Sequence, residues 1–514
     1  MIRYPLNEPM TQTVAANTTT QAQKTKSPNM AAPFGALVYL FSIALQALVP
    51  GAAQGQGTTT AAAVLSRSAK AMGTDALRTI QYSGSGFAFV FGQSARPGAP
   101  WPRFSLSAYT RELDFEAPAS HVQLVRTAVD TRGGGGVGVP IVNQTQNQFI
   151  LPNAPWAQQV DIWLTPHGFL KGAAANSATT ASRTIGGKPY DVVTFTRDKY
   201  KVNGYINDRG LVERVETWLE HPALGDMPIE AAYTEYKNVG GVEFPSRIVQ
   251  SQGGFPILDL TVSDIKPNAA VAIQAPQRGG GGGGGVNLTA PVKSIKAAEG
   301  VYYIIGGPNN SIAVEFRDHI VMIEAPMTEE RSLAFIAEAR IQIPNKPIRY
   351  VINTHHHFDH SGGLRTFAAE GATIITQEIN KPYYERALAG PRTLAPDNLE
   401  RSGRKMVIET FTDRKVLTDG VRSIEIHLVK DSPHTDGSAM AYLPNEKMLV
   451  EGDIYDMPGP GVPAPTEGPK TWANLVDNIE RLKLPVDRLL PVHAPDIVPI
   501  DELYKAAKRT RAAN

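Results

Sequence analysis

Residues 349–363 read RYVINTHHHFDHSGG and decide how the second half of the chain is interpreted. A β-branched stretch, typical of a buried strand, runs directly into four histidines and one aspartate. Alternate side chains of an extended segment share one side, so His355 and His357 are expected to point toward one metal ion. Asp359 and His360 then offer a carboxylate and an imidazole to a second ion. The motif H-x-H-x-D-H therefore predicts a centre for two metal ions.

Three further ligand types stand where later strand patterns end. His434 lies in DSPHTDGSAMAYLP, Asp453 closes KMLVEGD, and His493 closes RLLPVH. Imidazole and carboxylate ligands suit Zn²⁺, and also Fe or Mn. The chain contains no Cys, which excludes thiolate ligands, a Cys nucleophile and a disulfide framework. Any metal is therefore expected to be held by His and Asp side chains.

Residues 291–514 contain eight of the 11 histidines and alternate strand patterns with helical ones, as α/β domains do. The clearest helix is TWANLVDNIERLK, whose apolar residues recur at three-four spacing and indicate a core-facing stripe. His356, inside the motif, is expected to support the metal shell or to face solvent. His319 and His427 have no partner motif and are expected to be structural.

The order H-x-H-x-D-H, PHT-x-GS, GD and PVH resembles the metallo-β-lactamase superfamily over most of residues 291–514. The resemblance implies an αββα sandwich with the metal site on one edge. It also implies two ligand sets that share one residue: His355, His357 and His434 for metal 1, Asp359, His360 and His493 for metal 2, and Asp453 bridging both. A bridging Asp is more similar to the glyoxalase II, lactonase and general hydrolase branches than to β-lactamases that use Cys there. Glu324 stands where the family usually has Asp.

The leading hypothesis is an exported dinuclear zinc hydrolase, motivated by the complete ligand set. Its metal-bridged hydroxide would attack the carbonyl of an ester, lactone, thioester or β-lactam, because metal binding lowers the pKa of water from about 15.7 to about 7. Asp359 is the expected catalytic residue, orienting the nucleophile and passing its proton to the leaving group. The Pro- and Gly-rich loop after Asp453 is a candidate pocket wall, with Tyr455 as a candidate substrate contact. Residues 383–398 are expected to cover the mouth of the site.

Residues 54–275 form short runs of alternating apolar and polar residues, which predicts a β-rich N-terminal domain. One helix is expected around residues 61–72, and the NDRG sequence at 207–210 predicts a hairpin turn. The region weakly resembles the half-barrel, single-sheet domains of periplasmic lipoprotein carriers, which implies an apolar ligand as an alternative partner. Its three histidines are expected to be structural: His121, His167 and His221.

Residues 1–53 combine a basic flank, an apolar stretch and a small-residue exit, which indicates a signal peptide and a periplasmic or secreted protein. The alternative is a membrane anchor, so membrane association is expected only through an uncleaved leader. Seven consecutive glycines, 279–285, indicate a flexible linker over residues 276–290. The expected fold class is therefore α+β with two domains, a β-rich domain before an αββα sandwich at 291–514.

The net charge of +1, from 50 Lys and Arg against 49 Asp and Glu, gives no basic groove for nucleic acid. The expected partner is a small-molecule substrate. Two other functions stay open on the sequence. One is an iron-dependent, persulfide-type oxygenase on the same fold. The other is an apolar-ligand-binding protein whose second domain is secondary or vestigial.

Overall fold

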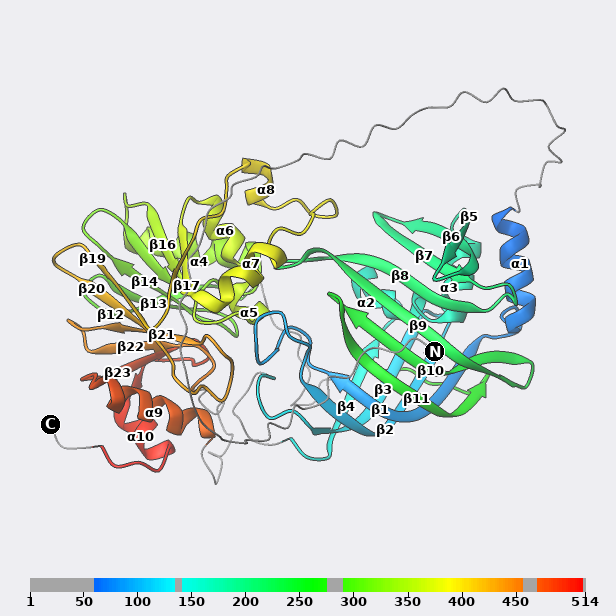
Figure 1. Ribbon diagram of the computed structural model, residues 1–514, viewed down its shortest axis with the longest axis horizontal. Helices are drawn as coiled ribbons and strands as arrows, with labels where there is room; N and C mark the ends of the chain where they lie inside the picture. Colours follow the sequence, from blue (N-terminus) through cyan, green and yellow to red (C-terminus); the bar gives the residue numbers. More distant parts are fainter. Residues whose placement is uncertain (1–59, 135–140, 275–289, 456–468, 512–514) are drawn as a thin grey trace, which may run out of the picture. The chain divides into compact units, whose positions relative to one another are not determined.

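A single antiparallel sheet of eleven strands dominates the first half of the computed structural model (Figure 1). The structure describes residues 60–134, 141–274, 290–455 and 469–511. The strands of this sheet, in chain order, are β1 Thr79–Phe89, β2 Arg103–Asp114, β3 Ala119–Ala128, β4 Gln144–Ile150, β5 Thr179–Ile185, β6 Lys188–Arg197, β7 Tyr200–Ile206, β8 Val212–His221, β9 Gly225–Val239, β10 Val242–Gln252 and β11 Phe255–Pro267. Their order across the sheet is β4-β3-β2-β1-β11-β10-β9-β8-β7-β6-β5, so β11 returns to pair with β1.

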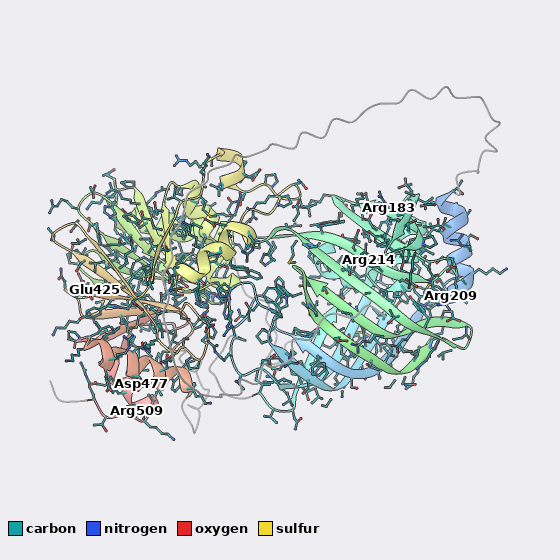
Figure 2. All side chains as sticks on the ribbon, in the orientation of Figure 1. Arg183, Arg209, Arg214, Glu425, Asp477 and Arg509 are labelled. Atoms are coloured by element: carbon teal, nitrogen blue, oxygen red, sulfur yellow. The ribbon has the colours of Figure 1, made fainter. Side chains whose placement is uncertain are left out.

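Three helices cover one face of this sheet: α1 Ala61–Met72, α2 Trp156–Trp163 and α3 Pro166–Ala175. Their apolar side chains share one core cluster with the inward-facing residues of the strands. The packing is close at Gly204 of β7, where a Cβ atom would lie 2.2 Å from the ring of Phe169 in α3. Alternate side chains of the strands point to the opposite face. There the Arg214 guanidinium, labelled in Figure 2, lies 3.8 Å from the ring centroid of Tyr205.

Two smaller sheets make up the second half. The seven-stranded sheet runs in chain order: β12 Lys293–Ala298, β13 Val301–Ile305, β14 Ser311–Glu315, β15 Ile320–Ile323, β16 Ile348–Ile352, β17 Thr373–Gln377 and β18 Ile408–Phe411. The strands of the six-stranded sheet also lie in chain order: β19 Arg414–Thr418, β20 Ser423–Leu428, β21 Ala439–Leu443, β22 Met448–Glu451, β23 Arg488–Pro491 and β24 Val498–Pro499. The pairs β15–β16, β16–β17, β17–β18 and β22–β23 are parallel.

Apolar side chains from both smaller sheets meet in one core. Further clusters join the outer faces of these sheets to helices, which Figure 1 shows beside them. The helices are α4 Glu329–Gln342, α5 Phe358–Ser361, α6 Leu364–Ala369, α7 Lys381–Ala387, α8 Asn398–Ser402, α9 Lys470–Leu482 and α10 Ile500–Ala506, with a 3₁₀ turn, η1, at Glu378–Asn380. Helices α4, α6 and α7 contribute to the cluster of the seven-stranded sheet, and α9 and α10 to that of the six-stranded sheet.

Several local predictions are confirmed. Helix α1 spans Ala61–Met72, and the predicted hairpin joins β7 to β8, with the Asn207 side chain accepting from the amides of Arg209 and Leu211. The apolar stripe of α9 is buried from Trp472 to Ile479. Helices α2 and α3 were not predicted.

The predicted leader and most of the predicted linker lie outside the described residues. Both halves described here fall within one structural unit, residues 58–514. The division into two domains stays a prediction. Among the described helices, none has the length and apolar character needed to cross a membrane.

Candidate metal centre

The seven predicted ligands all lie just beyond the carboxyl ends of strands or in the turns that follow them. His355 to His360 follow β16 and enter α5, while His434 lies between β20 and β21. Asp453 follows β22, and His493 follows β23. Because neighbouring parallel strands end at the same edge of a sheet, β22 and β23 bring Asp453 and His493 together.

The first group contains three histidines and one aspartate, all buried: His355, His357, His434 and Asp453. The Nε2 atom of His434 lies 3.4 Å from Nε2 of His355 and 3.1 Å from Nδ1 of His357. Asp453 Oδ2 lies 3.2 Å from the same His434 atom. Four ligand atoms therefore converge on one small volume.

The second group contains Asp359, His360, Asp453 and His493. The Nε2 atoms of His360 and His493 are 3.0 Å apart. Asp453 Oδ1 lies 2.8 Å from the first of them and 2.6 Å from the second, and Asp359 Oδ2 lies 3.2 Å from His360 Nε2. Asp453 thus presents one carboxylate oxygen to each group.

An outer partner holds the far nitrogen of four of the five histidines. These contacts are His355 Nδ1 with Thr354 Oγ1 at 3.0 Å, His357 Nε2 with the Ser94 carbonyl at 2.9 Å, His493 Nδ1 with the Pro308 carbonyl at 2.7 Å, and His360 Nδ1 with the Glu324 carboxylate. Carbonyl and carboxylate oxygens only accept hydrogen bonds, so the nitrogens that face them carry the hydrogens. In the neutral forms of His357, His360 and His493 the inner nitrogens are then bare lone pairs, as metal ligation requires. Without a metal ion, and although burial opposes the charge, Asp453, Asp359 and Glu324 raise the pKa of His360.

This donor set fits metal ions on chemical grounds. Bare nitrogen lone pairs 3.0–3.4 Å apart repel one another unless a cation or a shared proton lies between them. The fixed tautomers leave the inner nitrogens free to bind cations, and the two aspartates supply compensating negative charge. His355, His357, His434 and Asp453 would hold one metal ion. Asp359, His360, His493 and the shared Asp453 would hold the other.

Glu324, directly after β15, lies beside the ligand histidines. Its carboxylate is buried and accepts from the amide and the hydroxyl of Thr354 at 2.8 Å and 3.1 Å, in addition to its contact with His360. Its backbone has a φ of 74°, a left-handed conformation that is costly for a residue with a Cβ. Asp453 has a φ of 55°, so two residues of the centre carry such strain.

Glycine is required just before Asp453. A Cβ atom at Gly452 would lie 2.4 Å from Thr354 Oγ1, the hydroxyl that bonds Glu324. The GD pattern therefore has a steric reason, since a side chain there would displace the strand end that carries Asp453.

Electrostatics keep the carboxylates ionised. Although burial opposes the charge, His360 and His493 hold the pKa of Asp453 well below its usual range. The pKa of Asp359 is likewise lowered, against the effect of burial, chiefly by His360. Burial lowers the pKa of His355 and His434, which favours their neutral, ligating forms.

The other predicted residues do not belong to either group of ligands. His356 is buried and its Nε2 lies 3.0 Å from the Ser94 hydroxyl, so it supports the shell and does not face solvent. The ring of Tyr383 is 5.8 Å from the His356 ring, which places the start of residues 383–398 near the centre. Tyr455 is 5% exposed and packs against Trp472 at 5.3 Å, a core position. Its role as a substrate contact stays a prediction, and the following loop, 456–468, lies outside the described residues.

Sequence reasoning missed several groups around the ligands. Gln93 donates to Asp359 Oδ1 at 3.0 Å, and Asn309 donates to Asp359 Oδ2 at 3.3 Å. The Gly133 amide donates to the His434 carbonyl at 2.8 Å. Gln93, Ser94 and Gly133 belong to the first half of the chain, and no spacing in the sequence links them to the histidine motif.

Comparisons with known proteins match the second half of the chain to one family. Residues 304–493 match the family model of the metallo-beta-lactamase superfamily. A 2,4-dinitroanisole O-demethylase subunit alpha from Nocardioides sp. is 24% identical over 159 residues, which cover 30% of this chain and 43% of that protein. A linear primary-alkylsulfatase from Pseudomonas sp. is 20% identical over 239 residues, which cover 39% of this chain and 44% of that protein. The match thus spans less than half the length of either relative.

Among solved structures, a metallo-beta-lactamase from Pontibacter korlensis shares 16% identity with a TM-score of 0.32. The match covers 42% of this chain and 97% of that one.

Proposed function

We propose, from the premise that residues 304–493 form a metallo-beta-lactamase superfamily domain, that this protein is a dinuclear zinc hydrolase of carbonyl substrates. The substrate classes are an ester, lactone, thioester or β-lactam. The observation that carries the proposal is the double group of ligand atoms that share Asp453. Helices packed on the outer face of each smaller sheet support an αββα sandwich as its scaffold.

Two bound cations would lower the pKa of water to about 7 and polarise a carbonyl oxygen. The side chains of this chain transfer the proton and hold the ligands in place. Asp359, kept ionised by His360, accepts the proton of the attacking water and delivers it to the leaving group. The outer partners of the histidines fix each ring, so the ligands need little reorganisation on binding.

Export is a second part of the proposal, and the sequence of residues 1–53 supports it. The mass of the purified protein from the periplasm or medium tests it. Cleavage near residue 53 would support a signal peptide, whereas an intact N-terminus in a membrane fraction would favour an anchor.

The test of the proposed function combines elemental analysis of the metal with activity assays on a panel of substrates. The full chain is assayed with nitrocefin, a lactone, a thioester and an aryl ester. A primary alkyl sulfate and 2,4-dinitroanisole are added, because the relatives are named for them. We expect close to two zinc ions per chain and hydrolysis of at least one carbonyl substrate that a chelator abolishes. A chain that binds no stoichiometric metal overturns the proposal.

The second enzyme candidate is the iron-dependent, persulfide-type oxygenase. It differs in its metal and in its consumption of oxygen. The complete set of seven ligands, with Asp453 reaching both groups, favours the dinuclear hydrolase. One iron per chain together with substrate-dependent oxygen uptake would show that the protein is this oxygenase and not a zinc hydrolase.

A further inference from the structure

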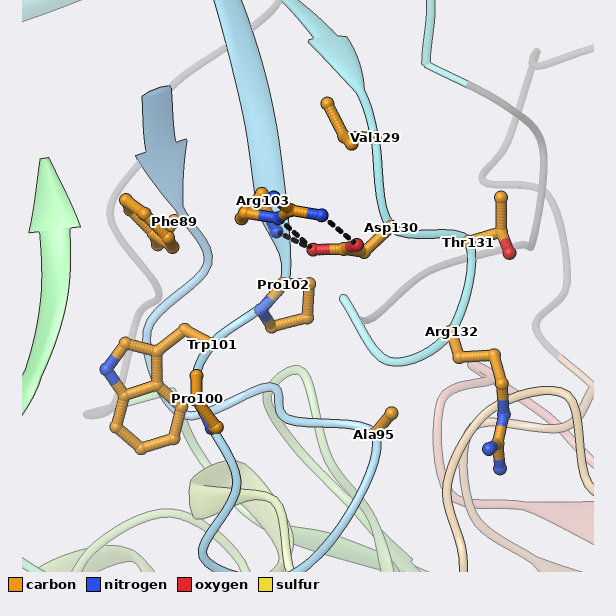
Figure 3. A pocket seen from close by; sticks show the side chains of 10 residues that line it. All are labelled: Phe89, Ala95, Pro100, Trp101, Pro102, Arg103, Val129, Asp130, Thr131 and Arg132. Atoms are coloured by element: carbon orange, nitrogen blue, oxygen red, sulfur yellow. Dashed lines mark hydrogen bonds and ion pairs between the residues drawn. The ribbon is translucent and has the colours of Figure 1, made fainter. Parts of the chain in front are cut away.

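The loop between β1 and β2, residues 90–102, carries groups of the first half of the chain into the metal centre. Its base is closed by the Val90 amide, which donates to the Pro102 carbonyl at 3.0 Å. Just beyond it, Arg103 donates from its backbone and side chain to Asp130 at 2.8 Å and 3.0 Å, which ties β2 to the segment after β3. Figure 3 shows this pair beside Pro102, in the wall of a pocket of about 440 Å³. These contacts therefore fix the base of the loop.

Aromatic packing fixes the tip of the loop against α5. A Cβ atom at Gly92 would lie 2.4 Å from the ring of Phe358, so the backbone of the loop rests directly on that ring. The rings of Phe91 and Trp101 lie 5.2 Å and 5.7 Å from the Phe358 ring. Phe358 is flanked in the chain by His357 and Asp359, and this packing therefore sets the position of two ligands.

Gln93, at the tip, contacts Asp359 directly. Its Nε2 donates to Asp359 Oδ1 at 3.0 Å, while Oδ2 of the same carboxylate lies 3.2 Å from His360 Nε2. The reverse orientation of the amide would place its oxygen against an ionised carboxylate, so electrostatics select the donating form. The amide oxygen of Gln93 is buried and has no hydrogen-bond partner among the described residues. Its hydrogen bond to Asp359 is thus the one polar contact that the structure gives this side chain.

We infer that Gln93 is a positioning residue for the second metal ion. By holding Oδ1 of Asp359, it leaves Oδ2 directed into the group formed with His360 and His493. The inference rests on the proposed dinuclear function and extends it: part of the outer shell comes from the eleven-stranded sheet. Ser94 acts in the same way on the first group, through its backbone carbonyl on His357.

The test compares Gln93→Ala and Gln93→Met in the full chain. Met keeps the length and volume of the side chain but cannot donate. The matched control is Gln148→Ala, at an exposed glutamine on β4. Each metal-free protein is titrated with Zn²⁺ against a competing chelator, and its thermal unfolding is recorded without metal. This readout does not depend on activity or on knowledge of the substrate.

Both Gln93 variants are expected to bind the second Zn²⁺ about 10–100-fold more weakly, the usual cost of losing an outer-shell partner. Binding of the first Zn²⁺ and unfolding of the metal-free protein should match the wild type, and so should every property of the control. Unchanged affinity for the second ion in Gln93→Met overturns the inference, because packing alone then explains the site. Failure of the wild type to bind two zinc ions would instead overturn the proposed function.

Discussion

Buried histidines occur in both halves of the molecule, and their hydrogen bonds differ. In the first half, His167 of α3 has both ring nitrogens engaged by the chain itself: Nδ1 lies 2.9 Å from Thr74 Oγ1, and Nε2 lies 3.1 Å from the Glu243 carbonyl. In the second half, the outer nitrogens of His357 and His360 face the Ser94 carbonyl and the Glu324 carboxylate. Their inner nitrogens face other imidazoles and Asp453.

Burial therefore does not by itself distinguish a ligand from a structural histidine. His167 is as inaccessible as His357, and burial lowers its pKa to about 4. What separates them is whether the second nitrogen meets a single hydrogen-bond partner or several other ligand atoms. A ring with one partner on each nitrogen stabilises the fold, and a ring whose inner nitrogen points into a convergent group of ligand atoms is prepared for a cation.

The largest effect is expected for Asp453→Ala. Asp453 presents an oxygen to each group, so its loss should weaken both metal sites at once. We expect fewer than one zinc per chain and a fall in hydrolysis greater than the roughly 100-fold limit typical for an outer-shell partner. Elemental analysis and initial rates measure these. Asp477→Ala, at an exposed position on α9, is the control and should retain metal and rate. Two tightly held zinc ions in the Asp453 variant would refute the shared-ligand geometry.

A smaller effect, on stability alone, is expected for His167→Phe. The folded-state pKa of about 4 lies below the unfolded value of about 6.5. The neutral ring thus stabilises the fold fully above pH 6.5, and this contribution is lost as the pH falls toward 4. The loss is about 3 kcal/mol for a shift of this size. In the variant, Thr74 loses its partner, which costs about 1–3 kcal/mol at pH 7.

Denaturant unfolding of the metal-free wild type and His167→Phe at pH 7 and pH 4.5 checks this. The stability advantage of the wild type should shrink at the lower pH. Protonation elsewhere affects both proteins equally and cancels in the difference. A difference that is the same at both pH values would show that His167 is not held neutral. Zinc binding at pH 7 should be unchanged.

The smallest effect is expected for His121→Ala. His121 of β3 is partly exposed, with Nδ1 3.3 Å from Glu112 and Nε2 3.0 Å from Asn147. Exposed pairs of this kind contribute about 0–1 kcal/mol. The free energy of unfolding should fall by no more than that, and the zinc content should not change. Loss of zinc in this variant would break the distinction between the two kinds of histidine.

The sequence predicts the elements whose pattern is local. Helix α1 has a periodic stripe and a Thr60 cap, and α9 has one strongly apolar face. Helices α2 and α3 escape such reasoning because they are short and pack against one face of the sheet. In α3 nearly every residue from Pro166 to Ala173 is buried, so no polar face marks its period.

The candidate centre divides in the same way. The seven ligands follow strand-end motifs that can be recognised along the chain, and the structure brings all seven together. The residues that hold the ligands in place cannot be recognised from motifs along the chain. Gln93 and Asp359 are separated by 266 positions, and only tertiary packing makes them neighbours. Glu324 lies between these cases, since the family pattern indicates its position but not its bonds to Thr354 and His360.

The packing of Phe358 has a consequence for expression of the second half alone. A gene truncated at the glycine run would lack Phe91 and Trp101, and the Phe358 ring would meet water. Newly exposed apolar surface of this kind promotes self-association. The truncated protein would also lack the backbone acceptor of His357. Soluble yield and zinc content should then decline together. The glycine run is therefore an unsuitable boundary for expressing the second half alone.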